Sequence, residues 1–158
     1  MKLTVIAVGR PGAQLANAIA EYEKRAARYW PVEFIEVRKE PARGRSEDQV
    51  RDAESARLLE RAPRDAELVA LTRTGGDAWS SGRLARHLGE MATQGKPGAA
   101  FLIGGALGLS LDALRTADQR MRLSTFTLPH DIARLVMAEQ LYRAGTIVRG
   151  EPYHKGLE

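Results

Sequence analysis

Five residues near the C-terminus carry side chains suited to proton transfer or charge stabilisation: His130, Glu139, Arg143, Tyr153 and His154. His130 follows a proline at the start of a long amphipathic segment, where an imidazole can act as a general base or contact RNA. Glu139 and Arg143 are four residues apart, so a helix would bring them together as an ion pair. The plainer interpretation of His130 is a half-buried turn histidine, and the plainer interpretation of Glu139 and Arg143 is a surface ion pair.

The tail Glu151–Lys155 brings together an aromatic ring, a potential base and a cation. Tyr153 suits stacking on a nucleobase, and the neighbouring His154 and Lys155 suit proton handling and phosphate contact. The alternative is a disordered chain end.

Two apolar segments end abruptly in residues that allow a tight turn or a close backbone approach. The first ends in Gly104-Gly105-Ala106-Leu107-Gly108, and the second is Leu123–Leu128, which leads into Pro129-His130. The glycines match neither GxGxxG nor a P-loop, so NAD and nucleoside triphosphate binding lose their usual support. They fit either a plain strand-to-helix turn or one half of a backbone-lined pocket for a nucleoside-like ligand.

Strand-like and helix-like segments alternate along the chain. The pattern predicts strands over Leu3–Gly9, Val32–Val37, Glu67–Leu71, Ala99–Ile103 and Arg120–Ser124. It predicts helices over Gly12–Tyr29, Ser46–Arg61, Ser80 or Ser81 to Gln94, Ser110–Ala117 and His130–Val148, with a loop over Thr72–Asp77. We expect one α/β domain over residues 1–158, with a mostly parallel sheet covered by helices on both faces.

Local signals mark several of these helices. Ser46 with Gln49 has the spacing of a capping box, and Ser110 is a further N-cap candidate. On the last helix we expect a buried stripe made of Ile132, Leu135, Val136 and Leu141.

Ligands of open parallel sheets bind outside the carboxyl ends of the strands. Three such ends are Leu71-Thr72, Ile103-Gly104-Gly105 and Ser124–Leu128. We expect all three to line one crevice.

Composition narrows the function classes. The 158 residues include no cysteine, which excludes disulfides, thiolate metal sites and a cysteine nucleophile. The three histidines are widely spaced, which argues against zinc, and no metal is expected. No apolar run is long enough to span a bilayer and no signal peptide is recognisable, so we expect a cytoplasmic protein without membrane contact. The net charge of +4, with Arg38, Lys39, Arg43 and Arg45 in one loop, favours a polyanionic partner.

The same motifs resemble the ribosomal RNA large subunit methyltransferase H family of SPOUT methyltransferases, nearly end to end. The resemblance rests on Leu102–Ser110, Leu123–His130, Ala138–Ala144 and Pro152-Tyr153-His154, together with the start Met1–Gly9. It implies an enzyme that uses S-adenosylmethionine to methylate N3 of pseudouridine 1915 in 23S rRNA on the ribosome. It also implies a homodimer and a C-terminal trefoil knot, which general topology rules argue against.

For the site, the resemblance assigns cofactor contacts to the three strand ends, at Leu71, Gly104, Gly105, Leu123, Ser124, Thr125, Phe126, Thr127 and Leu128. The chain departs from the family pattern where Ala106-Leu107 replaces Pro-Glu, where Asp131 replaces a common proline and where Lys155 replaces a frequent arginine.

Transfer of a methyl group to N3 requires loss of the imide proton. His130, His154 and Glu139 are candidates for handling that proton, Arg143 for charge stabilisation and Tyr153 for stacking on the target base. Two other readings stay open: a SPOUT methyltransferase with another RNA target, and a non-catalytic ribosome- or RNA-binding module on the same fold.

Overall fold

The computed structural model describes residues 1–155. In chain order its elements are β1 (Lys2–Val8), α1 (Ala13–Ala26), β2 (Val32–Val37), α2 (Glu47–Arg61), β3 (Glu67–Leu71), β4 (Asp77–Ala78), α3 (Ser81–Thr93), β5 (Gly98–Ile103), α4 (Leu111–Thr116), β6 (Gln119–Arg122), α5 (His130–Val148) and the 3-10 helix η1 (Pro152–His154). Residues 156–158, the end of the domain expected over residues 1–158, lie outside the described residues.

A six-stranded sheet in the order β2-β1-β5-β3-β6-β4 forms the centre of the molecule, and every neighbouring pair is parallel. The expected α/β architecture with a mostly parallel sheet is confirmed. The predicted loop over Thr72–Asp77 is wrong at its end, because Asp77 begins the two-residue strand β4 beside β6. So short and exposed a strand has no hydrophobic pattern to reveal it.

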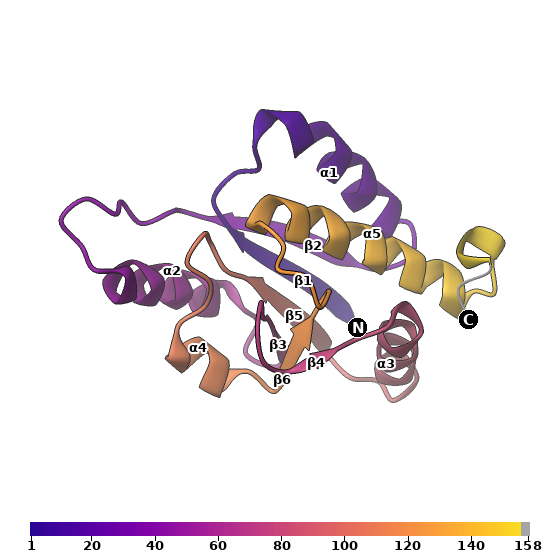
Figure 1. Cartoon of the computed structure of the whole chain (residues 1–158). Helices are drawn as coiled ribbons and strands as arrows, with labels where there is room; N and C mark the ends of the chain where they lie inside the picture. The colour runs from indigo at the N-terminus through magenta and orange to yellow at the C-terminus, as the bar shows by residue number, and fades with distance from the viewer. Residues whose placement is uncertain (156–158) are drawn as a thin grey trace.

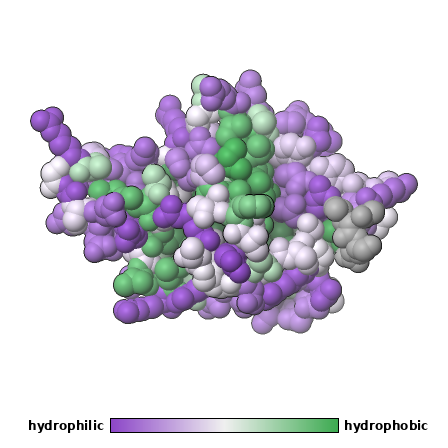
Figure 2. Space-filling model, viewed as in Figure 1, coloured by the Kyte–Doolittle hydropathy of each residue, from purple (hydrophilic) through white to green (hydrophobic). Residues whose placement is uncertain are grey.

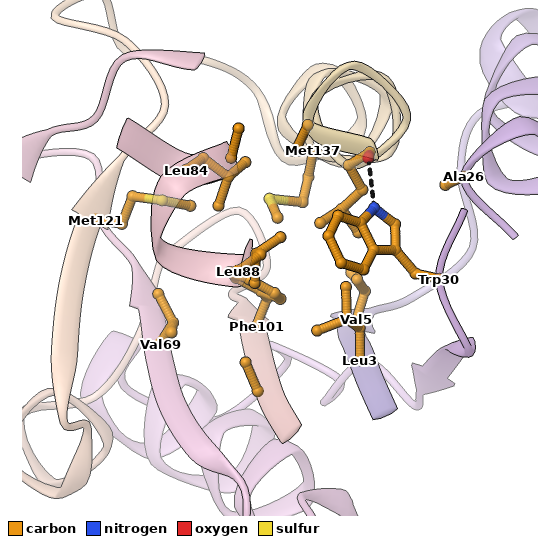
Figure 3. Packing of buried hydrophobic residues seen from close by; sticks show 14 of the residues in the cluster. Leu3, Val5, Ala26, Trp30, Val69, Leu84, Leu88, Phe101, Met121 and Met137 are labelled. Carbon is orange, nitrogen blue, oxygen red and sulfur yellow. Dashed lines mark hydrogen bonds between the residues drawn. The ribbon is translucent and has the colours of Figure 1, made fainter. Parts of the chain in front are cut away.

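Helices cover both faces of the sheet, as predicted (Figure 1). Alternation along β1 sends Leu3, Val5 and Ala7 into the core beneath α1, α3 and α5, while Ile6 and Val8 face α2 and α4. The first core also contains Trp30, whose indole N–H donates to the carbonyl of Leu141 at 2.8 Å (Figure 3). That bond holds the turn that follows α1 against α5.

Three helices begin at serine caps. The hydroxyl of Ser46 accepts from the N–H of Gln49, whose side chain accepts from the N–H of Ser46 in return, so the capping box is confirmed. Ser80, the first of the two alternatives, caps α3, and Ser110 caps α4. The starts of these three helices could therefore be predicted from local sequence.

The buried face of α5 differs from the predicted stripe. Leu141 is buried as expected, but Ile132, Leu135 and Val136 are only half-buried. The buried residues of α5 are Arg134, Met137, Ala138, Leu141, Ala144, Gly145 and Thr146. The backbone comes closest at Gly145, where a Cβ would lie 2.4 Å from the Cβ of Tyr29. The helix therefore turns the face that carries Met137, Leu141 and Gly145 inward, and Ile132, Leu135 and Val136 are left half-buried.

Candidate functional site

The strand ends of β3, β5 and β6 enclose a cavity of about 520 Å³, called the main cavity below. Most of the residues assigned by resemblance to the cofactor line it: Leu71, Gly104, Gly105, Leu123, Ser124, Phe126 and Leu128. Thr125 and Thr127 belong to the same segment but are exposed and do not line the cavity. The predicted meeting of the three strand ends is confirmed as geometry.

The glycine turn is tight enough to require glycine for its own folding. A Cβ on Gly104 would lie 2.6 Å from the carbonyl carbon of Gly108, and one on Gly105 would lie 2.8 Å from Oε1 of Glu54. Gly108 has φ +79°, which side chains rarely adopt. The turn thus folds back on itself and presents main chain, rather than side chains, as one wall of the main cavity.

Neighbouring elements hold this turn in place. Nε of Arg51 donates to the carbonyl of Leu107 at 3.0 Å, and a guanidinium nitrogen of Arg73 donates to the carbonyl of Ala106 at 3.1 Å. The hydroxyl of Ser55 accepts from the N–H of Ser110 at 2.9 Å. Both arginines line the main cavity and were missed by sequence reasoning. Arg73 lies two residues after the end of β3, and this position could have indicated its place at the cavity. Arg51 lies on α2, far from the strand ends in sequence, so no local signal marked it.

His130 lies in the wall of the main cavity, at the start of α5. Its Nε2 is 2.7 Å from Oδ1 of Asp131, and the other oxygen of Asp131 accepts from the N–H of Gly12 at 2.9 Å. Asp131, one of the departures from the family pattern, therefore ties the start of α1 to the start of α5 and places a carboxylate beside the imidazole.

Three other candidate residues lie elsewhere in the chain and contact one another. Arg143 donates to Oε1 of Glu139 at 3.0 and 2.6 Å, and the hydroxyl of Tyr153 donates to the same oxygen at 3.1 Å. The rings of Tyr142 and Tyr153 lie 4.5 Å apart. We call Glu139, Tyr142, Arg143 and Tyr153 the tail cluster. The ion pair of Glu139 and Arg143 is thus part of a partly buried network rather than a plain surface pair.

Titration behaviour reflects these contacts. Burial, and then the charge of Glu139 and its hydrogen bond, raise the pKa of Tyr153 above its ordinary value. The hydrogen bond to Glu139 likewise raises the pKa of Arg143. The tyrosine therefore stays a neutral donor and the arginine a cation near neutral pH.

His154 follows Tyr153 in η1 but is not part of the tail cluster. Its side chain lines a second cavity, of about 410 Å³, together with Trp79, Arg122 and Gln140. Within one chain, therefore, only His130 of the five candidate catalytic residues lines the main cavity.

Two classes of feature are missing from residues 1–155. No group of three or more His, Asp or Glu side chains gathers in a way that could hold a metal ion. No helix in this part of the chain is long and apolar enough to cross a membrane.

Comparison with known proteins relates this geometry to an enzyme family. A family model described as "Predicted SPOUT methyltransferase" matches residues 1–154. A protein of Gemmatimonas aurantiaca named "Ribosomal RNA large subunit methyltransferase H" is 51% identical over 156 residues, covering 98% of this chain and 100% of the relative. The protein of that name from Rubrobacter xylanophilus is 44% identical and covers 97% of this chain and 98% of its own length.

Solved structures support the same fold. A Bordetella pertussis Tohama I protein described as a probable methyltransferase superposes with a TM-score of 0.55 at 13% identity, over 90% of this chain and 95% of that one. TrmJ from Z. mobilis ZM4 gives a TM-score of 0.52 at 15% identity, over 89% of this chain and 69% of its own. By family model, sequence identity and length, the chain belongs to the SPOUT methyltransferases, in the ribosomal RNA large subunit methyltransferase H family.

Proposed function

We propose that this protein transfers the methyl group of S-adenosylmethionine to N3 of pseudouridine 1915 in 23S rRNA on the ribosome. The observation that carries the proposal is the main cavity, where three strand ends supply main chain and apolar side chains to one site. The relatives' shared name, which specifies large-subunit ribosomal RNA, supports the choice of substrate. We further propose that residues 1–158 form one cytoplasmic domain with the trefoil knot that the resemblance implies.

The main cavity has the chemistry that S-adenosylmethionine requires. Its volume of about 520 Å³ falls in the range of small-molecule sites. Leu71, Ile103 and Leu123 offer apolar surface for an adenine ring. The guanidinium groups of Arg51 and Arg73 offer cations for the carboxylate of the methionine part. Among the described residues, no aspartate or glutamate lines this cavity.

The chain's own residues then bind the cofactor, align it with the target base and accept the N3 proton. S-adenosylmethionine, when bound, supplies an electrophilic methyl group on sulfur. The glycine turn and Leu123–Leu128 fix its orientation, so that alignment with N3 contributes to the rate. His130 is placed to accept the N3 proton as the new N–C bond forms, because its side chain lines the cavity.

A homodimer would bring the remaining candidates to the site. We propose that the tail cluster and His154 of one protomer act on RNA bound at the main cavity of its partner. An apolar band over the N-terminal parts of α1 and α5 supports such an interface (Figure 2). Leu15, Ile132 and Leu135, carried by these helices, are only half-buried in the single chain.

Two measurements test the proposal. Calorimetry should show binding of S-adenosylmethionine and its demethylated product; RNA binding without cofactor affinity would instead favour a non-catalytic module. Mass spectrometry of 23S rRNA from cells lacking the protein should show loss of one methyl group at the pseudouridine, restored by the intact gene. Loss at another nucleotide would identify a different RNA target.

Complementation tests the shared site. Mixing a His130→Ala protomer with a His154→Ala protomer should restore about a quarter of the activity, because half of the dimers would be mixed and each would hold one intact site. Two inactive variants that stay inactive together, while gel filtration shows that they exchange, would contradict it.

A further inference from the structure

The loop between β2 and α2, residues 38–46, carries four cations and one acid and is called the basic loop below. Figure 1 shows it extending away from the sheet, beyond the start of α2. The acid, Glu40, is buried, whereas the cations are all exposed: Arg38, Lys39, Arg43 and Arg45. The loop therefore presents an excess of positive charge to its surroundings.

A hydrogen-bonded turn orders the tip of the basic loop. The N–H of Arg45 donates to the carbonyl of Ala42 at 3.1 Å, so the two residues between them form the centre of the turn. The second of these, Gly44, has φ +75°, a conformation that the third residue of a type II turn requires. The first, Arg43, is therefore an exposed cation on an ordered backbone.

The buried acid anchors the base of the loop to α2. The carboxylate of Glu40 pairs with Arg57 of α2 and, at 3.2 Å, with Arg45. Arg57 also donates to the carbonyl of Arg38 at 3.0 Å. The buried carboxylate of Glu54 accepts from the N–H of Glu40 at 3.1 Å. Because these contacts already order the loop, binding a partner there costs less conformational entropy than binding by a free chain.

Three cations of the loop remain available to a partner. Among residues 1–155, no carboxylate lies within ion-pair distance of Arg38, Lys39 or Arg43. The two acids in the first turn of α2 both face Arg51, at 3.9 and 2.9 Å, which offsets their charge. A group of unpaired cations favours a polyanion, because each contact with a phosphate releases condensed counterions.

The basic loop and the main cavity lie on the same edge of the sheet. β1 runs parallel to both β2 and β5, so the loop after β2 and the glycine turn after β5 both lie at the carboxyl ends of the strands. α2 connects the two regions: it begins at Glu47, directly after the loop, and Arg51, about 6 Å further along its axis, lines the main cavity. A base in the main cavity therefore brings the neighbouring phosphates of its strand to the edge that carries the basic loop.

We propose that the basic loop binds the phosphate backbone of ribosomal RNA beside the target base, at the main cavity of its own chain. This inference rests on the proposed function. Contacts with phosphates position a nucleic acid and carry no sequence information, so the loop supplies affinity and orientation while the chemistry stays at the main cavity. The place of the loop beside that cavity favours RNA over an acidic protein surface as the partner.

Binding of a 23S rRNA hairpin that contains the target pseudouridine tests the proposal. A double variant, Lys39→Ala with Arg43→Ala, should bind this hairpin about tenfold more weakly in about 0.1 M salt. The slope of log affinity against log salt concentration should become shallower by about two, because two phosphate contacts are lost. Calorimetry should show unchanged S-adenosylmethionine binding, since neither residue lines the main cavity. Unchanged affinity for the hairpin would overturn the proposal.

The matched control removes the same charge from the opposite edge of the sheet. Arg64 and Lys96 are exposed and precede β3 and β5, so they lie at the amino ends of these strands. A double variant, Arg64→Ala with Lys96→Ala, should keep the affinity for the hairpin within about twofold, because distant charges are screened in about 0.1 M salt. Equal weakening by the two double variants would show that net charge determines binding, and would overturn the proposal.

Methylation of ribosomes distinguishes RNA beside the target from another ribosomal component. In the variant that lacks Lys39 and Arg43, the KM for ribosomes should rise by about the same factor as the Kd for the hairpin, with kcat within about twofold. Weaker binding of ribosomes with unchanged binding of the hairpin would place the loop against another RNA segment or an acidic protein, and would overturn the proposal. A failure of the proposed function would appear separately, as absence of S-adenosylmethionine binding by the unaltered protein.

Discussion

The main cavity and the second cavity lie side by side and are built in different ways. The main cavity takes most of its walls from residues at or after the ends of three parallel strands, including the turn Gly104–Gly108. The second cavity takes its walls from side chains of Trp79, Arg122, Gln140 and His154, which lie on separate elements. A strand-end site follows from the order of the chain, whereas a side-chain site depends on how finished helices pack.

The largest effect that tests this difference is expected at Gly104. In Gly104→Ala the new Cβ would lie 2.6 Å from the main chain of Gly108, and backbone cannot yield as a side chain can. We expect a stability loss of about 1–3 kcal/mol and at least tenfold weaker S-adenosylmethionine binding, measured by urea unfolding and calorimetry.

Gly89→Ala is the matched control. Gly89 lies within α3, and a Cβ there would make an ordinary 3.5 Å contact with the side chain of Val148. It should stabilise the protein by up to about 1 kcal/mol and leave cofactor binding intact. Equal behaviour of the two variants would show that the glycine turn is not the determinant of the main cavity.

The next effect separates the two cavities by function. His154→Ala, or truncation after Pro152, should strongly reduce methylation of ribosomal substrate while S-adenosylmethionine binding survives, because neither change touches the wall of the main cavity. The measurements are methyl incorporation and calorimetry on the same preparations. Parallel loss of cofactor binding would contradict the separation.

A smaller effect concerns the pH dependence of the tail cluster. Since the pKa of Tyr153 is higher in the folded protein than its ordinary value near 10, its contribution to stability is complete below pH 10 and is lost as the pH rises through the folded-state pKa. In Tyr153→Phe the alkaline fall of the melting temperature should therefore be shallower. Tyr29, whose pKa is raised by its hydrogen bond to Glu151, should keep part of that fall in the variant.

The smallest effect is expected at the rim of the main cavity. Phe126 is 80% exposed, so Phe126→Ala removes little buried surface and should change stability by less than about 0.5 kcal/mol. If cofactor affinity stays within twofold while methylation falls, the ring contacts RNA or the partner protomer. A large loss of stability would show that the ring is buried in an assembly.

The fold and the main cavity could be predicted from the sequence because both depend on local signals. Ser46, Ser80 and Ser110 mark helix starts, and the apolar runs ending at Leu71 and Ile103 mark strand ends. The relation of Arg51 to the glycine turn, by contrast, arises only when α2 docks on the sheet.

The buried face of α5 was misjudged for a related reason. The apolar pattern points to Ile132 and Leu135, but the buried face runs through Met137 and Leu141 and includes Gly145, which lies close against Tyr29. Periodicity records which residues are apolar, and it does not record how near a neighbouring element will come.

The strand order also bears on how the protein is made. β1, which precedes the other five strands of the sheet along the chain, pairs with β2 on one side and with β5 on the other. During translation one edge of this apolar strand stays open until β5 has left the ribosome, and α5 arrives later still to close the core (Figure 1). Such long-range parallel pairing slows folding and leaves a nascent chain prone to aggregation. The main cavity is therefore complete only after α5 has been released, because His130 and Ala133 of that helix form part of its wall.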